Sequence, residues 1–541
     1  MFDYSAPGAT PGGSVTVWSA CPLQPVAAGV LTHFSYSVIS ELVGRGWYAY
    51  YDRLGFEPAP RSRLVRRHKG RAYLNLSLFA KLDAEQAGVE PISLRVNNRV
   101  IPLVDWEKTG FLAGFRLGRA RARMDETLAR MADEMDAVTQ RARNWYIKTQ
   151  GLRWSQAEVL QIMEEIERVG VESMAAYLGA RHHLEWLYAH LLAQLTAAHD
   201  RSESLLLLNN ALCGMQTLVE WELAQAVIAL SETLHEPEQV AWLKAGNAEQ
   251  WQERLPGKLA ANRFGEFLDT YGHRALHEGE MAVPRWAEDP AIVLRGLLVC
   301  VEHPTRHPAQ LPKSGALQKL LEALPAAQRK QGEQMMNKIR GLHRLQSRAL
   351  HALAYVWAGT RAWALAAARE AMVDGRLTEV QEVFSFELEE IKEMMTGEWN
   401  ISSLDEIHAT CAQRRAEYAA WRTQDAPEIL LDDVEGFATH HGLPGVTGHA
   451  AGPLRRWGET KKNGCSGAIL AAEVFDGGWA LALPLAVGFV AKFGSPLDPF
   501  VAAARAWNHP VMVGLGTRYD GLVEGAHTIL DIHPDSIRLE Q

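Results

Sequence analysis

The sequence is poor in cysteine and in clustered positive charge. It contains only five cysteines, which are scattered without CxxC spacing: Cys21, Cys213, Cys300, Cys411 and Cys465. This pattern argues against a disulfide framework or a structural zinc site and indicates reduced thiols. The formal net charge is -9, and no run of Lys and Arg is dense enough for a nucleic-acid footprint. We therefore expect neither nucleic acid as a partner nor a bound metal.

Long apolar runs and the features of a signal peptide are missing as well. The longest apolar run, WALALPLAVGFVA at residues 479–491, contains a proline and is too short to cross a bilayer. We expect it to form buried strand and turn. Residues 1–14 lack the basic and apolar regions of a signal peptide and are predicted to be a flexible lead-in. The sequence thus predicts a cytoplasmic protein without a membrane span.

What the sequence does contain is typical of a soluble protein with more than one domain. The chain has 541 residues, of which 47% are apolar and 22% charged, and one hydrophobic core rarely supports so long a chain. Residues 15–425 follow mainly a helical pattern, as the leucine spacing of LEWLYAHLLAQLTAAH illustrates. Short strands are expected near the start of this region, at VTVW, GRAYLNL and ISLRV.

The pattern changes after residue 425. Residues 426–440 are predicted to be a linker. Residues 441–541 contain the strand-like runs GAILAAEV, AVGFVA, PVMVGLG and HTILDI, with a helix at about 499–508, which is the pattern of a compact α/β domain. The predicted fold class is therefore α+β multidomain, with a large, mostly helical substrate-binding domain at 15–425 and an α/β domain at 441–541.

Several segments, taken in order, resemble the phosphoenolpyruvate-utilising enzyme family, above all its rifampin phosphotransferase and phosphoenolpyruvate synthase-like branches. They are VWSACPLQPVAAGVLTHFSYS, YGHRALHEGEMAVPRWAEDP, DGRLTEVQEVFSFELEEI, GLPGVTGHAAGPLRR and HPVMVGLGTRYDGLVEGAHTILDI. The resemblance implies that residues 441–541 form a swivelling phosphohistidine-like domain. It also implies that the helical part binds a bulky, largely apolar acceptor.

Two features of that family have no counterpart in this sequence. The nucleotide-binding ATP-grasp domain is not matched, and no Gly-rich phosphate loop replaces it. The catalytic histidine of the family's motif GG-x-x-SH-x-A-x-x-AR is also absent: aligning on Gly494 puts Asp498 in its place, and aligning on Arg505 puts Pro499 there. An aspartate with an ordinary pKa of about 4 is ionised at neutral pH and repels phosphate. We therefore expect no phosphoryl relay by this chain alone, and no cofactor.

The strongest candidate site is the segment YGHRALHEGEMAVPRW. The predicted catalytic residues are His273, Arg274 and Glu278, together with Asp498 of the C-terminal loop. A guanidinium beside an imidazole can hold a phosphate ester, and a carboxylate can fix the tautomer of the imidazole. The predicted substrate-binding residues are Lys492, Glu280, Arg285, Trp286, Trp18 and His33.

Structural interpretations remain open for several of these residues. Glu280 and Arg285 are also consistent with a buried salt-bridge network that fastens two helices. Lys492 is also consistent with a solvated surface lysine. Trp18 and His33 are also consistent with an aromatic core.

Three functions follow from this pattern of retained and missing residues. The first is a lyase that acts on the phosphate ester of a bulky apolar alcohol and eliminates phosphate to give an alkene, with Asp498 as the base. The second is an acceptor-binding or regulatory subunit that works with a separate ATP-grasp kinase subunit. The third is a non-catalytic protein that binds a hydrophobic ligand.

Overall fold

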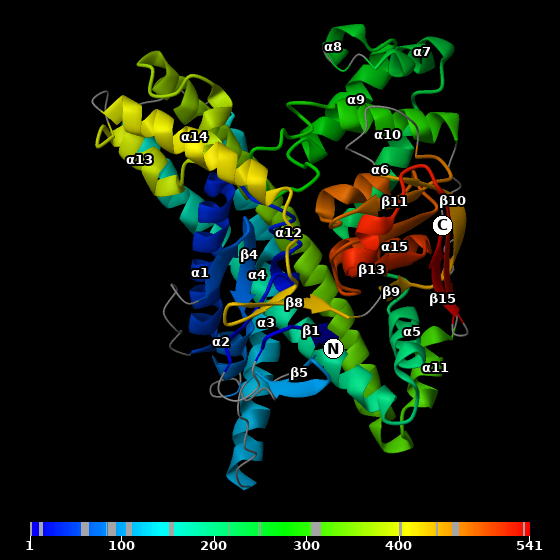
Figure 1. Cartoon of the computed structure of the whole chain (residues 1–541). Helices are drawn as coiled ribbons and strands as arrows, with labels where there is room; N and C mark the ends of the chain where they lie inside the picture. The colour runs from blue at the N-terminus through cyan, green and yellow to red at the C-terminus, as the bar shows by residue number, and fades with distance from the viewer. Residues whose placement is uncertain are drawn as a thin grey trace. The chain divides into compact units, whose positions relative to one another are not determined.

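The computed structural model describes residues 3–541 except 10–14, 56–63, 83, 85–92, 104–110, 151–155, 216, 247, 249, 304–314, 400–402, 440–441, 457–464 and 534–535. The chain divides into two compact units. Unit 1 comprises Met1–His182, His277–Val283 and Arg348–Thr439; unit 2 comprises His183–Leu276, Pro284–Ser347 and His440–Gln541. Figure 1 labels the elements along the chain.

Unit 1 combines long helices with a mixed sheet. Two of the helices, α4 and α12, also contribute residues to unit 2. The helical elements of unit 1 are η1 (Cys21–Leu23), α1 (His33–Leu54), α2 (Leu76–Leu82), α3 (Phe111–Thr149), α4 (Gln156–Thr196), α12 (Arg329–Val373), η5 (Val380–Ser385), α13 (Leu388–Thr396) and α14 (Leu404–Trp421). Its strands are β1 (Asp3–Ser5), β2 (Val17–Ser19), β3 (Val65–His68), β4 (Arg71–Asn75), β5 (Ser93–Val96), β6 (Arg99–Pro102), β7 (Ile429–Leu431) and β8 (Val434–Ala438).

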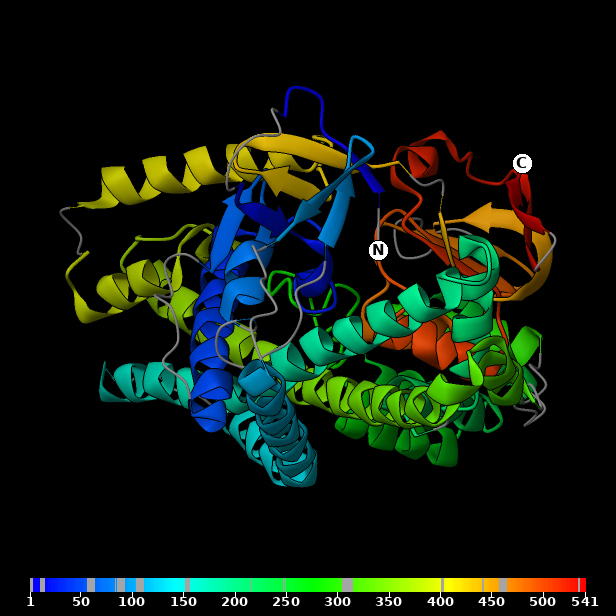
Figure 2. The ribbon, with the colours of Figure 1, turned by 90° about the horizontal axis from the view of Figure 1, so that it is seen from below.

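Helix α1 shows how local sequence sets an element boundary in unit 1. At its start, the Thr32 hydroxyl accepts a hydrogen bond from the backbone N–H of Ser35, and at its end Gly55 adopts the left-handed conformation with φ 77°. Such residues satisfy backbone groups that a helix end leaves unpaired. The buried side of the helix carries Val38 and Leu42, and α1 packs against α3 (Figure 2).

The sheet of unit 1 pairs segments that lie far apart in the sequence. Among the described residues its strand order is β3-β4-β2-β7-β8-β1-β5-β6. The predicted strands at VTVW, GRAYLNL and ISLRV are confirmed as β2, β4 and β5. β7 pairs antiparallel with β2, and β8 with β1.

Two segments of unit 1 differ from the sequence-based expectation. Asp3–Ser5, within the expected flexible lead-in, form β1, and its backbone is held by β5 and β8. Residues 429–431 and 434–438, within the expected linker, form β7 and β8. β1 has both of its partners far along the chain, whereas β7 and β8 also pair with each other as a local hairpin, which the sequence analysis did not recognise. The chain passes from unit 1 to unit 2 between Thr439 and His440.

Unit 2 joins a group of helices to a second mixed sheet. Its helical elements are α5 (Arg201–Ala211), α6 (Val219–Ser231), α7 (Pro237–Ala245), α8 (Trp251–Arg254), α9 (Lys258–Tyr271), α10 (Ala291–Glu302), α11 (Ala316–Ala323), η4 (Ala326–Gln328), η7 (Gly477–Ala482), α15 (Pro499–Trp507) and η8 (Gly516–Gly521). Its strands are β9 (Leu443–Val446), β10 (Gly448–Arg455), β11 (Ile469–Ala472), β12 (Gly488–Ala491), β13 (Val511–Val513), β14 (His527–His533) and β15 (Ser536–Glu540).

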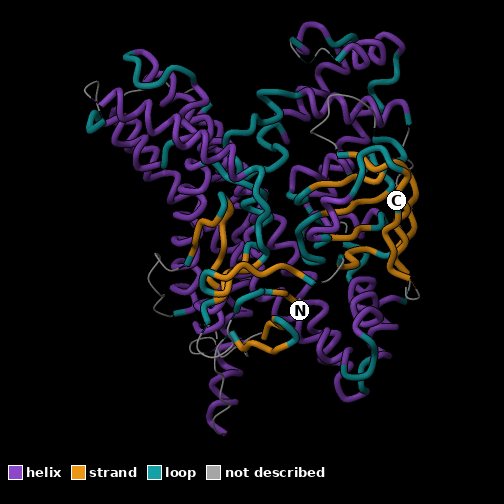
Figure 3. The backbone as a smooth tube through the Cα atoms, viewed as in Figure 1, coloured by secondary structure: helices purple, strands orange, loops and turns teal. Residues whose placement is uncertain are grey.

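The sheet of unit 2 has a parallel centre and antiparallel edges. Among the described residues its order is β15-β14-β10-β11-β12-β13-β9, and β10, β11, β12 and β13 run parallel. Figure 3 shows these strands together in orange. The central strands β11, β12 and β13 are buried at every position, as is typical of parallel strands covered on both faces. The predicted strands and the helix at about 499–508 are confirmed, and so is the α+β fold class.

The apolar run at residues 479–491 forms part of η7 and then β12, which confirms the predicted buried strand and turn. η7 contacts α6 and α10, whereas α15 contacts α6, β9 and η7. Within the part of the chain that is described, no helix is long and apolar enough to cross a membrane.

Candidate functional site

The turns that follow α9 position His273 and Arg274 in unit 2. The backbone N–H of Arg274 donates to the carbonyl of Tyr271 at 2.9 Å, and the N–H of Trp286 donates to the carbonyl of Arg274 at 2.9 Å. A further bond joins the N–H of Ala287 to the carbonyl of Gly272 at 2.8 Å. These bonds fold the segment back on itself, so its backbone is fixed. The side chains of His273 and Arg274 are 1% and 0% exposed.

A carboxyl group that the sequence reasoning missed lies in the electrostatic field of Arg274. Glu220, in the first turn of α6, is fully buried. The Ser347 hydroxyl of α12 donates to Glu220 Oε2 at 2.6 Å and accepts from the N–H of Val219 at 3.0 Å. Burial raises the pKa of Glu220, whereas Arg274 and the Ser347 hydrogen bond oppose this rise. We call Arg274, His273, Glu220 and Ser347 the Arg274 cluster.

The sequence does contain a signal for Glu220. In VEWELAQAVIALS, the buried residues Leu223, Ala224 and Val227 stand three, four and seven positions after Glu220. This is the spacing of one helix face, so Glu220 occupies a core position of an amphipathic helix. A charged residue at such a position is seldom fully buried without a specific role.

The polar character of the Arg274 cluster continues along α12. His343 and Gln346 are 0% exposed, as is Ser347, and His343 and Ser347 lie one helical turn apart on the same face. Among the described residues, neither amide atom of the Gln346 side chain has a hydrogen-bond partner. Unit 2 therefore buries several polar side chains on one short stretch of α12.

The predicted site residues Glu278 and Glu280 belong to unit 1, unlike His273 and Arg274. Glu280 Oε1 accepts from the hydroxyls of Ser35 and Thr32 at 2.7 and 3.0 Å, and Oε2 accepts from the N–H of Thr32 at 2.7 Å. Burial raises the pKa of Glu280, and these hydrogen bonds oppose the rise. These hydrogen bonds tie residues 277–283 to the N-terminus of α1.

In the C-terminal loop, Asp498 is the N-cap residue of α15 and Pro499 occupies the first helical position, a combination that favours helix initiation. Asp498 is 3% exposed, and its Oδ2 accepts from the N–H of Ser495 at 2.8 Å. Gly494, with φ 116°, allows the loop to turn there. The loop therefore uses one carboxylate oxygen to hold its own turn.

Arg505 fastens the same loop to the rest of unit 2. Its Nε donates to the carbonyl of Gly445 at 3.0 Å, and its NH2 group donates to Asn209 Oδ1 at 3.3 Å and to the carbonyl of Pro496. Burial lowers the pKa of Arg505, and the negative charge of Asp498 opposes this effect. Asp498 therefore also stabilises a buried cation.

The other predicted binding residues of unit 2 have defined partners. Lys492 Nζ lies 2.8 Å from both carboxylate oxygens of Asp520. The ring of Trp286 stacks on that of Phe267 with centroids 6.5 Å apart. Arg285 is 1% exposed. Lys492 is thus an ion-paired residue and not a merely solvated one.

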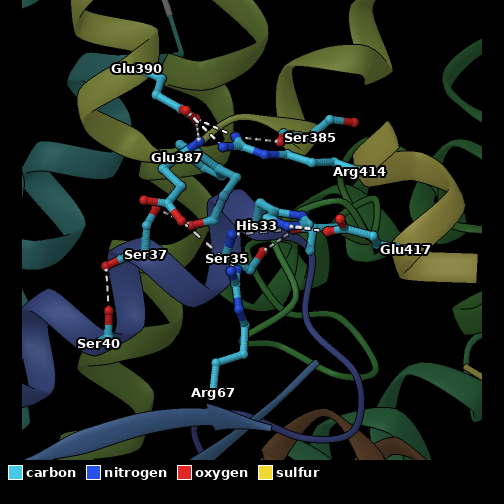
Figure 4. Close-up of polar contacts among 12 residues, drawn as sticks. His33, Ser35, Ser37, Ser40, Arg67, Ser385, Glu387, Glu390, Arg414 and Glu417 are labelled. Carbon is cyan, nitrogen blue, oxygen red and sulfur yellow. Dashed lines mark hydrogen bonds and ion pairs between the residues drawn. The ribbon is translucent and has the colours of Figure 1, made fainter. Parts of the chain in front are cut away.

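In unit 1, His33 lies in a network of charged side chains drawn from α1, β3, α13 and α14 (Figure 4). His33 Nε2 is 3.3 Å from Glu417 Oε2, and its ring lies 5.1 Å from the ring of Trp421. Arg414 donates to both carboxylate oxygens of Glu390. Trp18 lies apart from this network, in β2, and packs with Ala20, Tyr73 and Leu430. Trp18 thus takes the aromatic-core position that the sequence left open.

The His33 imidazole is expected to make unit 1 sensitive to acid. Burial and the charges of Arg67 and Arg414 lower the pKa of His33 from 6.5 to about 4, against the opposing effect of Glu417. On acidification the unfolded chain therefore takes up a proton before the folded chain does. The contribution of the neutral His33 imidazole to the free energy of unfolding is therefore present above pH 6.5 and is lost as the pH falls towards 4.

We expect His33→Gln to reduce the loss of stability between pH 7 and pH 4.5, measured by urea unfolding at each pH. Glu417→Gln should enlarge that loss, because it removes the carboxylate that raises the pKa of His33. An equal loss in the wild type and both variants would contradict this assignment.

Part of the chain is similar to a domain of rifampicin phosphotransferases. Residues 170–348 match the family model described as the rifampicin phosphotransferase fourth domain. This match confirms the predicted resemblance to phosphoenolpyruvate-utilising enzymes of the rifampicin phosphotransferase kind. All members of the Arg274 cluster lie inside the matched residues.

The chain is also similar to the prodigiosin synthesizing transferase PigC of Serratia marcescens. The two are 23% identical over 435 residues, which cover 74% of this chain and 47% of the relative. The chain thus spans about half the length of this curated relative.

Proposed function

We propose that this protein is a lyase that eliminates phosphate from the phosphate ester of a bulky apolar alcohol. The observation that carries the proposal is the Arg274 cluster. In it, the positive charge of a fully buried guanidinium opposes the rise that burial causes in the pKa of a fully buried carboxyl group. A buried cation can neutralise the charge of a departing phosphate. A carboxyl group of raised pKa can take part in proton transfer near neutral pH.

In the proposed reaction, Arg274 and His273 bind the phosphate group. Asp498, which belongs to the same unit, is the base that the sequence predicts. It takes a proton from the carbon next to the ester carbon, and the electron pair of that C–H bond forms the double bond. The C–O bond breaks and its electron pair stays on the phosphate oxygen. The phosphate takes up one proton, which balances the one removed from carbon, so the net reaction converts the phosphate ester dianion into an alkene and hydrogenphosphate.

The test is incubation of the protein with geranyl phosphate and dodecyl phosphate, with glycerol phosphate as a hydrophilic control. We expect equal amounts of inorganic phosphate and alkene from the apolar esters and none from the control. Mass spectrometry separates elimination, which gives the alkene, from hydrolysis, which gives the alcohol. Release of phosphate from none of the esters, or recovery of the alcohol alone, would overturn the proposal.

A second candidate function is the binding of an acceptor for a phosphotransferase whose nucleotide-binding part is a separate polypeptide. It is supported by the similarity to a transferase about twice as long as the region matched here. The test is affinity purification of the protein from its native cells, followed by mass spectrometry. Recovery of a stoichiometric ATP-grasp protein supports this candidate, whereas catalytic activity of the isolated chain on phosphate esters counts against it.

A further inference from the structure

Glu220 has one oxygen whose hydrogen-bonding role is fixed by its neighbours. The Ser347 hydroxyl has a single proton and accepts a hydrogen bond from the N–H of Val219 at 3.0 Å. Its own proton is donated to Glu220 Oε2, at 2.6 Å. Oε2 is thus an acceptor, and when the carboxyl group is protonated its proton resides on Oε1.

The second oxygen, Oε1, has no hydrogen-bond partner among the described residues, although it is fully buried. A buried carboxyl oxygen without a partner is costly for the folded state, so we expect a water molecule or a ligand group to complete its hydrogen bonding. Both elements that hold Glu220, the first turn of α6 and the middle of α12, are regular helix. The two helices therefore hold the carboxyl group in place, with the hydrogen-bonding capacity of Oε1 unused among the described residues.

We infer that Glu220 is the general acid that protonates the departing phosphate; the inference rests on the lyase function proposed above. As the C–O bond breaks, the proton on Glu220 Oε1 passes to the bridging oxygen that receives the electron pair. Glu220 is left ionised next to Arg274, which stabilises its negative charge. The proton taken up by Asp498 returns to Glu220 through solvent, so the cycle closes without a further reactant.

The division of labour between the two carboxyl groups follows from their surroundings. Asp498 accepts a hydrogen bond from a backbone N–H and stabilises the buried Arg505. Glu220 lies on the buried, apolar face of α6. Burial and the negative charge of Glu222 favour the neutral form of its carboxyl group, and the charge of Arg274 opposes this effect. Two carboxyl groups whose environments favour opposite protonation states are the usual arrangement for an acid and a base.

The test is Glu220→Gln with two substrates that share one alkyl group, dodecyl phosphate and dodecyl sulfate. Removal of a general acid should reduce phosphate release by about 100-fold. Sulfate leaves without protonation, so its elimination should change by less than about 3-fold if only general-acid assistance is lost. Glu238→Gln, at an exposed position in α7 of the same unit, is the matched control and should leave both rates unchanged.

A pH profile provides a second readout. The wild-type rate should fall as the pH rises through the pKa of Glu220, and this fall should be absent in Glu220→Gln. Ser347→Ala removes a hydrogen bond that lowers this pKa, so it should move the fall to higher pH. The pH profile of Ser347→Ala also tests the role of Glu220 if the Glu220→Gln variant does not fold.

The outcomes separate the two proposals. In the first case, the wild type eliminates phosphate while Glu220→Gln reduces the rates with dodecyl phosphate and dodecyl sulfate equally, or reduces neither rate. Either result overturns only the role of Glu220. An unmoved pH profile in Ser347→Ala has the same meaning. If the wild type acts on no phosphate ester, the lyase proposal is overturned, and the role of Glu220 with it.

Discussion

Replacing Gly478 by alanine is expected to destabilise unit 2 by about 3 kcal/mol. A Cβ atom at this position would lie 1.7 Å from the carbonyl oxygen of Ala275 and 2.7 Å from its carbonyl carbon. Both are backbone atoms, so no side chain can rotate away. Relief requires η7 to move away from the turn that carries His273 and Arg274.

The measurement is urea unfolding of the full chain, followed by circular dichroism and tryptophan fluorescence. Gly521→Ala is the matched control: Gly521 is exposed and lies at the end of η8, and a Cβ atom added there would meet no described atom within 4 Å. Its effect should stay within about 0.5 kcal/mol. Equal unfolding midpoints for the two variants would show that the close approach at Gly478 is not rigid.

Arg274→Met is expected to reduce kcat/KM for elimination from dodecyl phosphate by about 1000-fold. The substitution removes the buried cation proposed to bind the phosphate and keeps an apolar side chain of similar length. Arg274→Lys keeps the charge but not the planar pair of donors, and its loss should be smaller. The matched control is Arg254→Met, at an exposed arginine in α8 of the same unit, which should leave kcat/KM unchanged.

Stability measurements on the same variants separate catalysis from folding. Arg274 opposes the rise in the pKa of Glu220 that burial causes, so its removal makes the burial of Glu220 costlier at neutral pH, by about 3 kcal/mol. Arg274→Met combined with Glu220→Gln should recover much of that stability, because the uncompensated carboxyl group is gone, but it should recover no activity. If Arg274→Met retains full elimination activity at a temperature at which it stays folded, Arg274 acts only through the stability of unit 2 and does not bind the phosphate.

Local sequence patterns predicted the elements of unit 2 well. The runs that became β11, β12, β13 and β14 are apolar and end at turn residues, and Asp498-Pro499 marks the start of α15. The same kind of pattern found β2, β4 and β5 in unit 1. It failed for β1, whose partners lie far along the chain, as Ala438 opposite Tyr4 shows, and it overlooked the local hairpin of β7 and β8.

The candidate site was predictable only in part, for a similar reason. His273 and Arg274 stood out because a guanidinium and an imidazole are adjacent in the sequence. Glu280 stood out for its charge, yet its carboxylate holds Thr32 and Ser35 at the start of α1. Glu220 did not stand out, although its place on the apolar face of α6 was visible in the spacing.

Consecutive residues were enough to predict the mainly helical character of residues 15–425, seven of the described strands, the family resemblance and the absence of the histidine at the loop of Asp498. Those features depend on short-range periodicity, on turn residues and on motif order, all of which are written in consecutive residues. Only the tertiary structure decided which charges meet. Ser347 reaches Glu220 across 127 positions of sequence, because the packing of α12 against α6 brings them together, and no local pattern encodes a packing distance.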